Sequence, residues 1–171
     1  MPGGARSLRV EPLGEAHDRR AFASGVEPLD RYLHTQAGQD ARRRVSSCFV
    51  LVEEGEPAPL GFYTLAATSI ALTELPEALT KGLPRYPTVP ATLMGRLAVD
   101  ERHRRRGLGE LLILDALARA LRSEIATFAF VVDAKDEGAA AFYARYGFRE
   151  LTVDGRRLLL PMAEAAQSFT Q

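Results

Sequence analysis

Arginines and glycines gather in one short segment between an apolar run and a helix with apolar periodicity. The segment reads Arg104-Arg105-Arg106-Gly107-Leu108-Gly109; the apolar run 97–100 precedes it, and apolar residues at helical spacing follow it up to Leu121. Glycines let backbone N–H groups approach an anion closely, and the positive end of a helix dipole favours a phosphate. The sequence therefore predicts a phosphate-binding loop between a strand and a helix.

The two commoner phosphate-binding loops do not fit this segment. A Walker A loop ends in Gly-Lys-Ser/Thr, but Gly109 is followed by Glu110, and the only lysines are Lys81 and Lys135. A dinucleotide-binding turn needs a third glycine where Leu112 stands. On the six residues alone, a plain strand-to-helix turn with a solvated basic run remains the alternative.

The pattern Arg104-x-x-Gly107-x-Gly109 resembles the acetyl-CoA pyrophosphate loop of the GNAT N-acetyltransferases. A second segment, 139–148, resembles the helix that lies beside the pantetheine arm in that family and carries a tyrosine near the thioester sulfur. Tyr143 matches that tyrosine, so the resemblance implies that it donates a proton to the leaving thiolate. The alternative is that Tyr143 is one more half-buried aromatic residue of a helix. The resemblance covers roughly residues 6–163.

The resemblance implies acetyl-CoA as co-substrate, bound by the end of the strand, the loop and the tyrosine helix. The backbone of Leu97 and Val99 would pair with the pantetheine, and one of their N–H groups would stabilise the oxyanion. Asp136 stands where the family often has an asparagine, so one donor is lost. The implied cofactor-binding residues are Leu97, Ala98, Val99, Arg104, Arg105, Arg106, Gly107, Leu108, Gly109, Asp136, Ala139 and Phe142.

No general base for the acceptor amine stands out. Glu53 and Glu74 are candidates, and a water chain is a third. An α-amine with a pKa near 8 is already partly neutral at pH 7, so a dedicated base is not required.

Four further segments resemble the toxin acetyltransferases of bacterial toxin–antitoxin pairs. That resemblance implies acetyl transfer to the α-amine of aminoacyl-tRNA, a small ribbon-helix-helix antitoxin and a homodimer. An RNA-facing surface would then be formed by Arg42, Arg43, Arg44, Arg85 and Arg96; clustered arginines favour RNA and scattered ones do not. The alternatives are a GNAT enzyme that acetylates a small-molecule, protein or peptide amine, and a non-catalytic acetyl-CoA-binding module. The four segments are 22–25 with 29–33, 61–65, 83–90 and 95–100.

Composition limits the classes of protein to which the chain can belong. Its 171 residues predict a single domain, 1–171, with a core at about 6–163. The formal net charge is zero, so nucleic-acid binding would have to come from local patches. Cys48 is the only cysteine, which excludes an intrachain disulfide, and its apolar neighbours predict a buried strand position rather than a nucleophile.

The three histidines have no ligand spacing, so we expect no metal. The absence of a long apolar run predicts no membrane span and a cytoplasmic location.

Hydrophobic periodicity predicts the order β-α-β-β-α-β-α-β-α-β-β. This order indicates an α/β, single-domain GNAT-like fold, with a mixed, mostly antiparallel twisted sheet and helices on both faces. Three prolines make 83–90 an extended connector, Gly147 ends a helix, and Asp154-Gly155 joins the last two strands. The expected strands are 8–13, 47–53, 60–72, 92–99, 128–132, 149–153 and 157–162. The expected helices run from 28 toward 44, over 74–83, from the loop to 121, and over 137–146.

Overall fold

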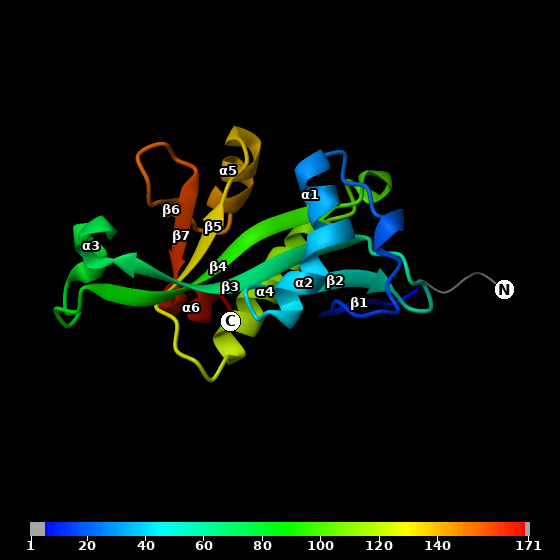
Figure 1. Cartoon of the computed structure of the whole chain (residues 1–171). Coiled ribbons are helices and arrows are strands. Elements are labelled where there is room, and N and C mark those ends of the chain that lie inside the picture. The colour runs from blue at the N-terminus through cyan, green and yellow to red at the C-terminus, as the bar shows by residue number, and fades with distance from the viewer. Residues whose placement is uncertain (1–5, 170–171) are drawn as a thin grey trace. The chain divides into compact units, whose positions relative to one another are not determined.

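Seven strands form one mixed sheet in the computed structural model, which describes residues 6–169. Their hydrogen-bonded order is β1-β2-β3-β4-β5-β7-β6; β4 and β5 are parallel, whereas β1–β2, β2–β3, β5–β7 and β6–β7 are antiparallel. The mixed, mostly antiparallel sheet is therefore confirmed. The strands are β1 Leu8–Pro12, β2 Ser47–Glu53, β3 Gly61–Ala71, β4 Thr88–Val99, β5 Ala129–Asp133, β6 Arg149–Glu150 and β7 Arg157–Pro161 (Figure 1). The α-helices are α1 Glu27–Arg31, α2 Ala37–Arg42, α3 Glu77–Thr80, α4 Leu108–Arg122, α5 Glu137–Ala144 and α6 Met162–Phe169.

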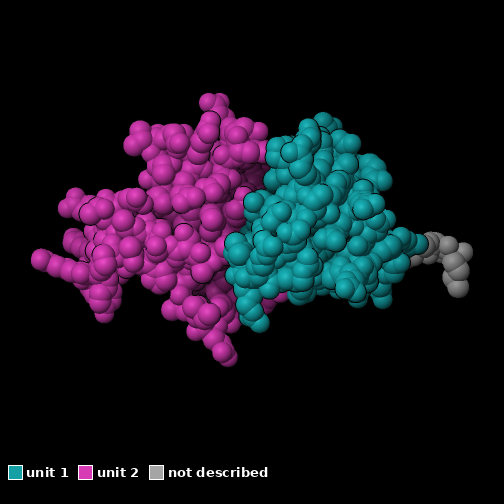
Figure 2. Space-filling view, in the orientation of Figure 1, with its two compact units in different colours: residues 1–65, 96–116 teal, residues 66–95, 117–171 magenta. Residues whose placement is uncertain are grey.

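The chain divides into two compact units, coloured separately in Figure 2. Unit 1 comprises residues 1–65 and 96–116, and unit 2 comprises residues 66–95 and 117–171. The arginine- and glycine-rich loop therefore belongs to unit 1, and Tyr143 belongs to unit 2. The expected single domain stays a prediction.

The core of unit 1 is built where β2 and β3 pair beneath the segment 22–37. Strands β2 and β3 pair antiparallel, with Leu51 opposite Gly61. A Cβ at Gly61 would lie 2.9 Å from the Ala98 carbonyl oxygen and 2.9 Å from Leu112 Cδ1. Only glycine therefore lets β3 pass this close to β4 and α4. The buried cluster consists of Phe22, Tyr32, Leu33, Ala37, Cys48, Val50, Val52, Phe62 and Ala98.

The core of unit 2 is built around β5, whose first four residues are buried. Ala91 of β4 pairs with Ala129 of β5, and Phe130 pairs with Leu160 of β7. Such burial on both sides explains the continuous apolar run in the sequence. The buried cluster here consists of Ile70, Leu75, Val89, Ala91, Ala129, Val131 and Leu159.

The predicted helix from residue 28 toward 44 is interrupted by a π-helix, Tyr32–Gln36, between α1 and α2. The Ala37 N–H donates to the Tyr32 carbonyl, five residues earlier. This wider turn leaves Tyr32, Leu33 and Ala37 all in the core. Single π-turns of this kind are frequent at functional sites.

Strand β4 begins at Thr88, so the expectation of a connector over 83–90 and a strand from 92 was wrong by four residues. Pro90 lies inside this strand. It has no N–H to donate, but its carbonyl accepts from the Phe128 N–H at 2.8 Å. The connector is limited to residues 83–87.

Three further element boundaries differ from the sequence prediction. The expected helix 74–83 is a 3-10 turn, Leu72–Glu74, followed by the four-residue α3. Strand β6 keeps only two residues, although Gly155 does lie in the turn with φ +70°. Helix α6 was not predicted at all. None of the helices formed by residues 6–169 combines the length and the apolar character needed to cross a bilayer.

Candidate active site

The loop between β4 and α4 exposes backbone N–H groups at the start of a long helix. Arg105 and Gly107 both have positive φ angles, +64° and +73°. The first α-helical bond of α4 runs from the Leu111 N–H to the Gly107 carbonyl, at 3.1 Å. The N–H groups of residues 108–110 therefore lack an acceptor within the helix. A Cβ at Gly107 would meet nothing within 4 Å, so the backbone there is open to an anion.

The three arginines of the loop have different surroundings. Arg104 donates from Nη2 to the Ser24 carbonyl, and Arg106 Nη2 lies 3.4 Å from Glu53 Oε1. The exposed Arg105 side chain forms no hydrogen bond or ion pair within residues 6–169. Arg104 and Arg106 therefore hold the loop in place, and Arg105 is available to a ligand. Glu53, a candidate base, is instead paired with Arg106.

Asp100, the residue directly after β4, is fully buried and ties the segment before α1 to this loop. Its Oδ2 accepts from the Ala23 N–H at 3.0 Å, and its Oδ1 accepts from Arg102 Nε at 2.9 Å. Burial alone would raise the pKa of Asp100, but the hydrogen bonds from Arg102 and Ala23 outweigh it and lower the pKa to about 2. Sequence reasoning did not single out Asp100. The available signal was a carboxylate at the end of a buried strand, two residues before an arginine.

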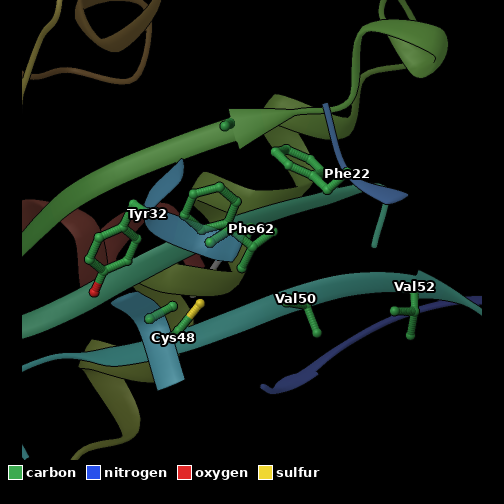
Figure 3. Close-up of a cluster of buried hydrophobic side chains, with 9 residues drawn as sticks. Phe22, Tyr32, Cys48, Val50, Val52 and Phe62 are labelled. Atoms are coloured by element: carbon green, nitrogen blue, oxygen red, sulfur yellow. The ribbon is translucent and has the colours of Figure 1, made fainter. Parts of the chain in front are cut away.

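Arg96 of β4 lies flat on an aromatic ring in unit 1. Its Cζ is 3.5 Å from the ring centroid of Tyr32, which is typical of a cation–π contact. The Tyr32 ring lies 6.4 Å from that of Phe62 at an angle of 16° (Figure 3), and its hydroxyl donates to Asp40. Burial raises the pKa of Tyr32 to about 12, and the hydrogen bond to Asp40 adds to this. The ring thus fixes Arg96, whose N–H groups have no partner within the described residues.

The structure brings together part of the predicted basic surface. Hydrogen bonds from Gln36 and Tyr32 lower the pKa of Asp40, and the charges of Arg96 and Arg43 lower it further. Residues 42–44 are exposed at the end of α2. Arg43 and Arg96 therefore lie near the same carboxylate of α2, and Arg42 and Arg44 are the sequence neighbours of Arg43. Arg85 is exposed in unit 2.

Tyr143, on α5 of unit 2, combines a buried ring with an unpaired hydroxyl. The residue is 5% exposed, and its ring lies 5.3 Å from that of Phe142 and 5.7 Å from that of Phe148. The hydroxyl has no hydrogen bond within residues 6–169, yet no fully buried polar side-chain atom there lacks a partner. The hydroxyl therefore reaches the surface. Burial raises the pKa of Tyr143 above its usual range, and the charge of Asp133 adds to this, so the phenol is a neutral donor at physiological pH.

Asp136 is the N-cap of α5. Its Oδ1 accepts from the Ala139 N–H at 2.8 Å, which satisfies one of the unpaired donors at the start of the helix. Ala139 and Phe142 follow on the same helix and are half-buried. Helix α5 ends at Ala144, two residues before the predicted end at 146, and Gly147 has the positive φ, +94°, expected of a glycine that follows a helix.

A surface pocket of about 390 Å³ lies in unit 1 beside Gly25 and α1. Glu27 and Arg31 in its lining form an ion pair, and His34 Nε2 lies 2.8 Å from the Phe22 carbonyl oxygen. The lining therefore offers no surplus of cations to a phosphate. It consists of Gly25, Glu27, Asp30, Arg31, His34 and Thr35.

Cys48 is buried, as predicted, and burial raises the pKa of its thiol to about 12. A thiol that stays protonated is a poor nucleophile. Among the described residues, no cluster of three or more histidine, cysteine, aspartate or glutamate side chains could hold a metal ion.

Comparison with known proteins decides the family. The acetyltransferase (GNAT) domain matches residues 44–150, a span that contains both the loop and Tyr143. The chain belongs to the GNAT acetyltransferase family. This GNAT chain is 35% identical over 155 residues to the tRNA-acetylating toxin of Mycobacterium tuberculosis, covering 90% of this chain and 91% of the relative.

Solved structures show the same GNAT fold. AtaT complexed with acetyl-methionyl-tRNAfMet has a TM-score of 0.87 and 25% identity, covering 95% of this chain and 99% of AtaT. A second AtaT structure is a tyrosine-to-phenylalanine mutant bound to the C-terminus of the antitoxin AtaR and to acetyl-CoA. It has a TM-score of 0.82 and 25% identity, covering 96% of this chain and 99% of the mutant. The resemblance to GNAT enzymes and to their toxin branch is thereby confirmed.

Proposed function

We propose that this GNAT enzyme transfers the acetyl group of acetyl-CoA to the α-amine of the amino acid on charged tRNA. The observation that carries acetyl transfer is Tyr143, whose buried ring presents an unpaired, protonated hydroxyl. The tRNA acceptor is supported by the relative named as a tRNA-acetylating toxin and by the AtaT complex with acetyl-methionyl-tRNAfMet.

The residues of unit 1 fit the phosphate end of acetyl-CoA. The N–H groups of residues 108–110, the dipole of α4 and the unpaired Arg105 all favour a pyrophosphate. The backbone of Leu97 and Val99 would bind the pantetheine, and an N–H there would donate to the developing oxyanion. Ala98 itself is buried in the core and fixes this strand end.

The chemistry needs one bond formed, one broken and protons moved. The amine nitrogen bonds to the acetyl carbon as the carbon–sulfur bond breaks, and Tyr143 gives its proton to the departing thiolate. The amine loses a proton to water, and the Tyr143 phenolate regains a proton from solvent. With a pKa near 8, roughly a tenth of the amine is already neutral at pH 7, so no protein base is needed.

Gly107→Glu is expected to weaken acetyl-CoA binding by several kcal/mol, because it puts a carboxylate into the open space beside the loop. Gly107→Ala is the matched control, since it carries the same positive-φ strain without the charge. Titration calorimetry compares the two variants with the wild-type protein. Equal acetyl-CoA affinities of the glutamate and alanine variants would show that the pyrophosphate does not bind at this loop.

Mass spectrometry of charged tRNAs incubated with acetyl-CoA tests the acceptor. We expect acetylated aminoacyl-tRNA, binding that weakens steeply with salt, and arrested growth of a bacterium expressing the protein. The exposed residues 42–44, together with Arg85 and Arg96, supply the cations for such binding. If free amines or peptides are acetylated and no charged tRNA is, the acceptor assignment is wrong. If nothing is acetylated although acetyl-CoA binds, the protein is a non-catalytic binding module.

Two partner assignments complete the proposal: a small ribbon-helix-helix antitoxin and a second copy of the chain, both in the cytoplasm. The AtaT structure with the AtaR C-terminus supports an antitoxin. The second copy is proposed from the resemblance to the toxin acetyltransferases, and Tyr86, 66% exposed in the connector 83–87, is a side chain that such a contact would cover. Light scattering at micromolar concentration is expected to report a dimer, and a stable monomer would remove that assignment.

A further inference from the structure

Two arginines converge on Gly38 of α2. A Cβ at Gly38 would lie 2.9 Å from Arg19 Nη1 and 3.3 Å from Arg42 Nη1. Arg19 comes from the 3-10 turn Arg19–Ala21, far from Arg42 in the sequence. The guanidinium of Arg19 therefore occupies the space that a side chain at position 38 would fill.

This pair has no acidic partner. Within residues 6–169 neither Arg19 nor Arg42 forms a side-chain hydrogen bond or an ion pair. Asp40, the carboxylate of α2, accepts from Tyr32 and Gln36 instead. Two cations held this close repel each other unless an anion lies between them.

More positive charge surrounds the same helix. The charges of Arg19 and Arg96 both act on the buried Cys48, and those of Arg96 and Arg43 both act on Asp40. This group of arginines forms a local positive patch on a chain with zero formal net charge.

We propose that Arg19 and Arg42, which meet at Gly38 of α2, together bind one phosphate of the RNA acceptor. The assignment rests on the proposed function for its acceptor class. Each guanidinium presents a planar fork of N–H donors that matches phosphate oxygens, and one phosphate has enough oxygens for both. A polynucleotide is favoured over an acidic peptide because its regularly spaced phosphates also serve the exposed Arg43 and Arg44, which directly follow α2.

The variant Gly38→Ala is expected to disturb this phosphate site without destabilising the fold. The new methyl group meets only the far ends of flexible arginine side chains, and alanine favours a helix more than glycine does. The melting temperature is therefore expected to stay the same or rise, while affinity for tRNA falls about fivefold because Arg19 is displaced. A lower melting temperature, or unchanged tRNA affinity, would contradict the proposed geometry.

Arg19→Gln and Arg42→Gln test the shared phosphate, with Arg20→Gln as the control for loss of one neighbouring exposed charge. Each of the two test variants is expected to weaken binding of deacylated tRNA about tenfold, with acetyl-CoA affinity unchanged. The slope of log affinity against log salt is expected to be smaller than that of the wild type by about 1 in each single variant. The double variant is expected to differ from the wild type by the same amount, about 1, because the same single phosphate contact is lost in all three.

Several results would overturn the inference. Affinity and slope equal to those of Arg20→Gln would show that the pair binds no phosphate. A double variant whose slope falls by about 2 would show two separate phosphates. Loss of binding to an acidic peptide but not to tRNA would assign the pair to a protein partner. Because deacylated tRNA is the probe, these results do not depend on whether the wild-type enzyme acetylates charged tRNA.

Discussion

Tyr143→Phe is expected to lower the rate of acetyl transfer by about 10²–10⁴-fold, the usual contribution of a general acid. The variant removes only the hydroxyl, which has no hydrogen bond within the described residues, so folding and acetyl-CoA affinity should be nearly unchanged. The raised pKa of Tyr143 keeps the phenol protonated at and above neutral pH. Its ionisation should therefore impose no fall in the wild-type rate between pH 6 and about 9. Single-turnover measurements at saturating acetyl-CoA test the rate, and calorimetry tests the affinity.

Tyr146→Phe is the matched control for this experiment. Tyr146 lies three residues further along, just past the end of α5; its ring is 5.2 Å from the same Phe142 ring, and the residue is half-buried. We expect this variant to keep nearly all of the wild-type rate. Turnover of Tyr143→Phe equal to that of Tyr146→Phe would return Tyr143 to a packing role.

Asp100→Asn is expected to destabilise the folded protein by about 2–4 kcal/mol at pH 7, because it removes a buried charge that accepts from Ala23 and Arg102. The shift of the Asp100 pKa from 3.8 to about 2 corresponds to about 2 kcal/mol of stability. A pKa lowered by folding stabilises the native state above the unfolded pKa. The contribution is therefore complete above about pH 4 and is lost as the pH falls toward 2.

Urea unfolding of wild type and variant across this range measures the effect as a difference in free energy of unfolding. The difference should be constant from pH 5 to 8 and shrink as the pH falls below 4. Asp154→Asn is the control, because this carboxylate also has a lowered pKa, through Thr152 and Arg156, but is exposed. If the difference in free energy of unfolding between wild type and Asp100→Asn does not change with pH, then packing and not the charge of Asp100 holds the segment before α1 in place.

The sequence predicted the order of strands and helices up to β7 because most of their signals are local. The Asp154-Gly155 turn, the helix end at Gly147 and the apolar run of β5 each depend on neighbouring residues only. The π-helix could not be predicted in this way, because Tyr32 is held by the distant Phe62 and Arg96. The early start of β4 was missed because Pro90 is tolerated in the strand only through its carbonyl bond to Phe128.

The residues of the candidate site also differ in whether local sequence patterns could predict them. Tyr143 and the loop at Gly107 could be proposed as site residues from the sequence because each belongs to a contiguous motif with recognisable residue types and spacing. The bond between Asp100 and Ala23 and the approach of Arg19 to Arg42 could not be predicted, because the residues in each pair are distant in the sequence. Arg104 and Arg106 carry charge that suits a phosphate, but their positions are set by Ser24 and Glu53, which no local pattern indicates.

The burial of Cys48 bears on how this enzyme tolerates oxidation. Each turnover releases a thiol, coenzyme A, which under oxidising conditions forms mixed disulfides with accessible protein cysteines. The chain has one cysteine, and its sulfur is enclosed by the apolar core of unit 1 with the pKa of the thiol raised to about 12. The folded protein therefore offers its own product no accessible thiol with which to form a mixed disulfide.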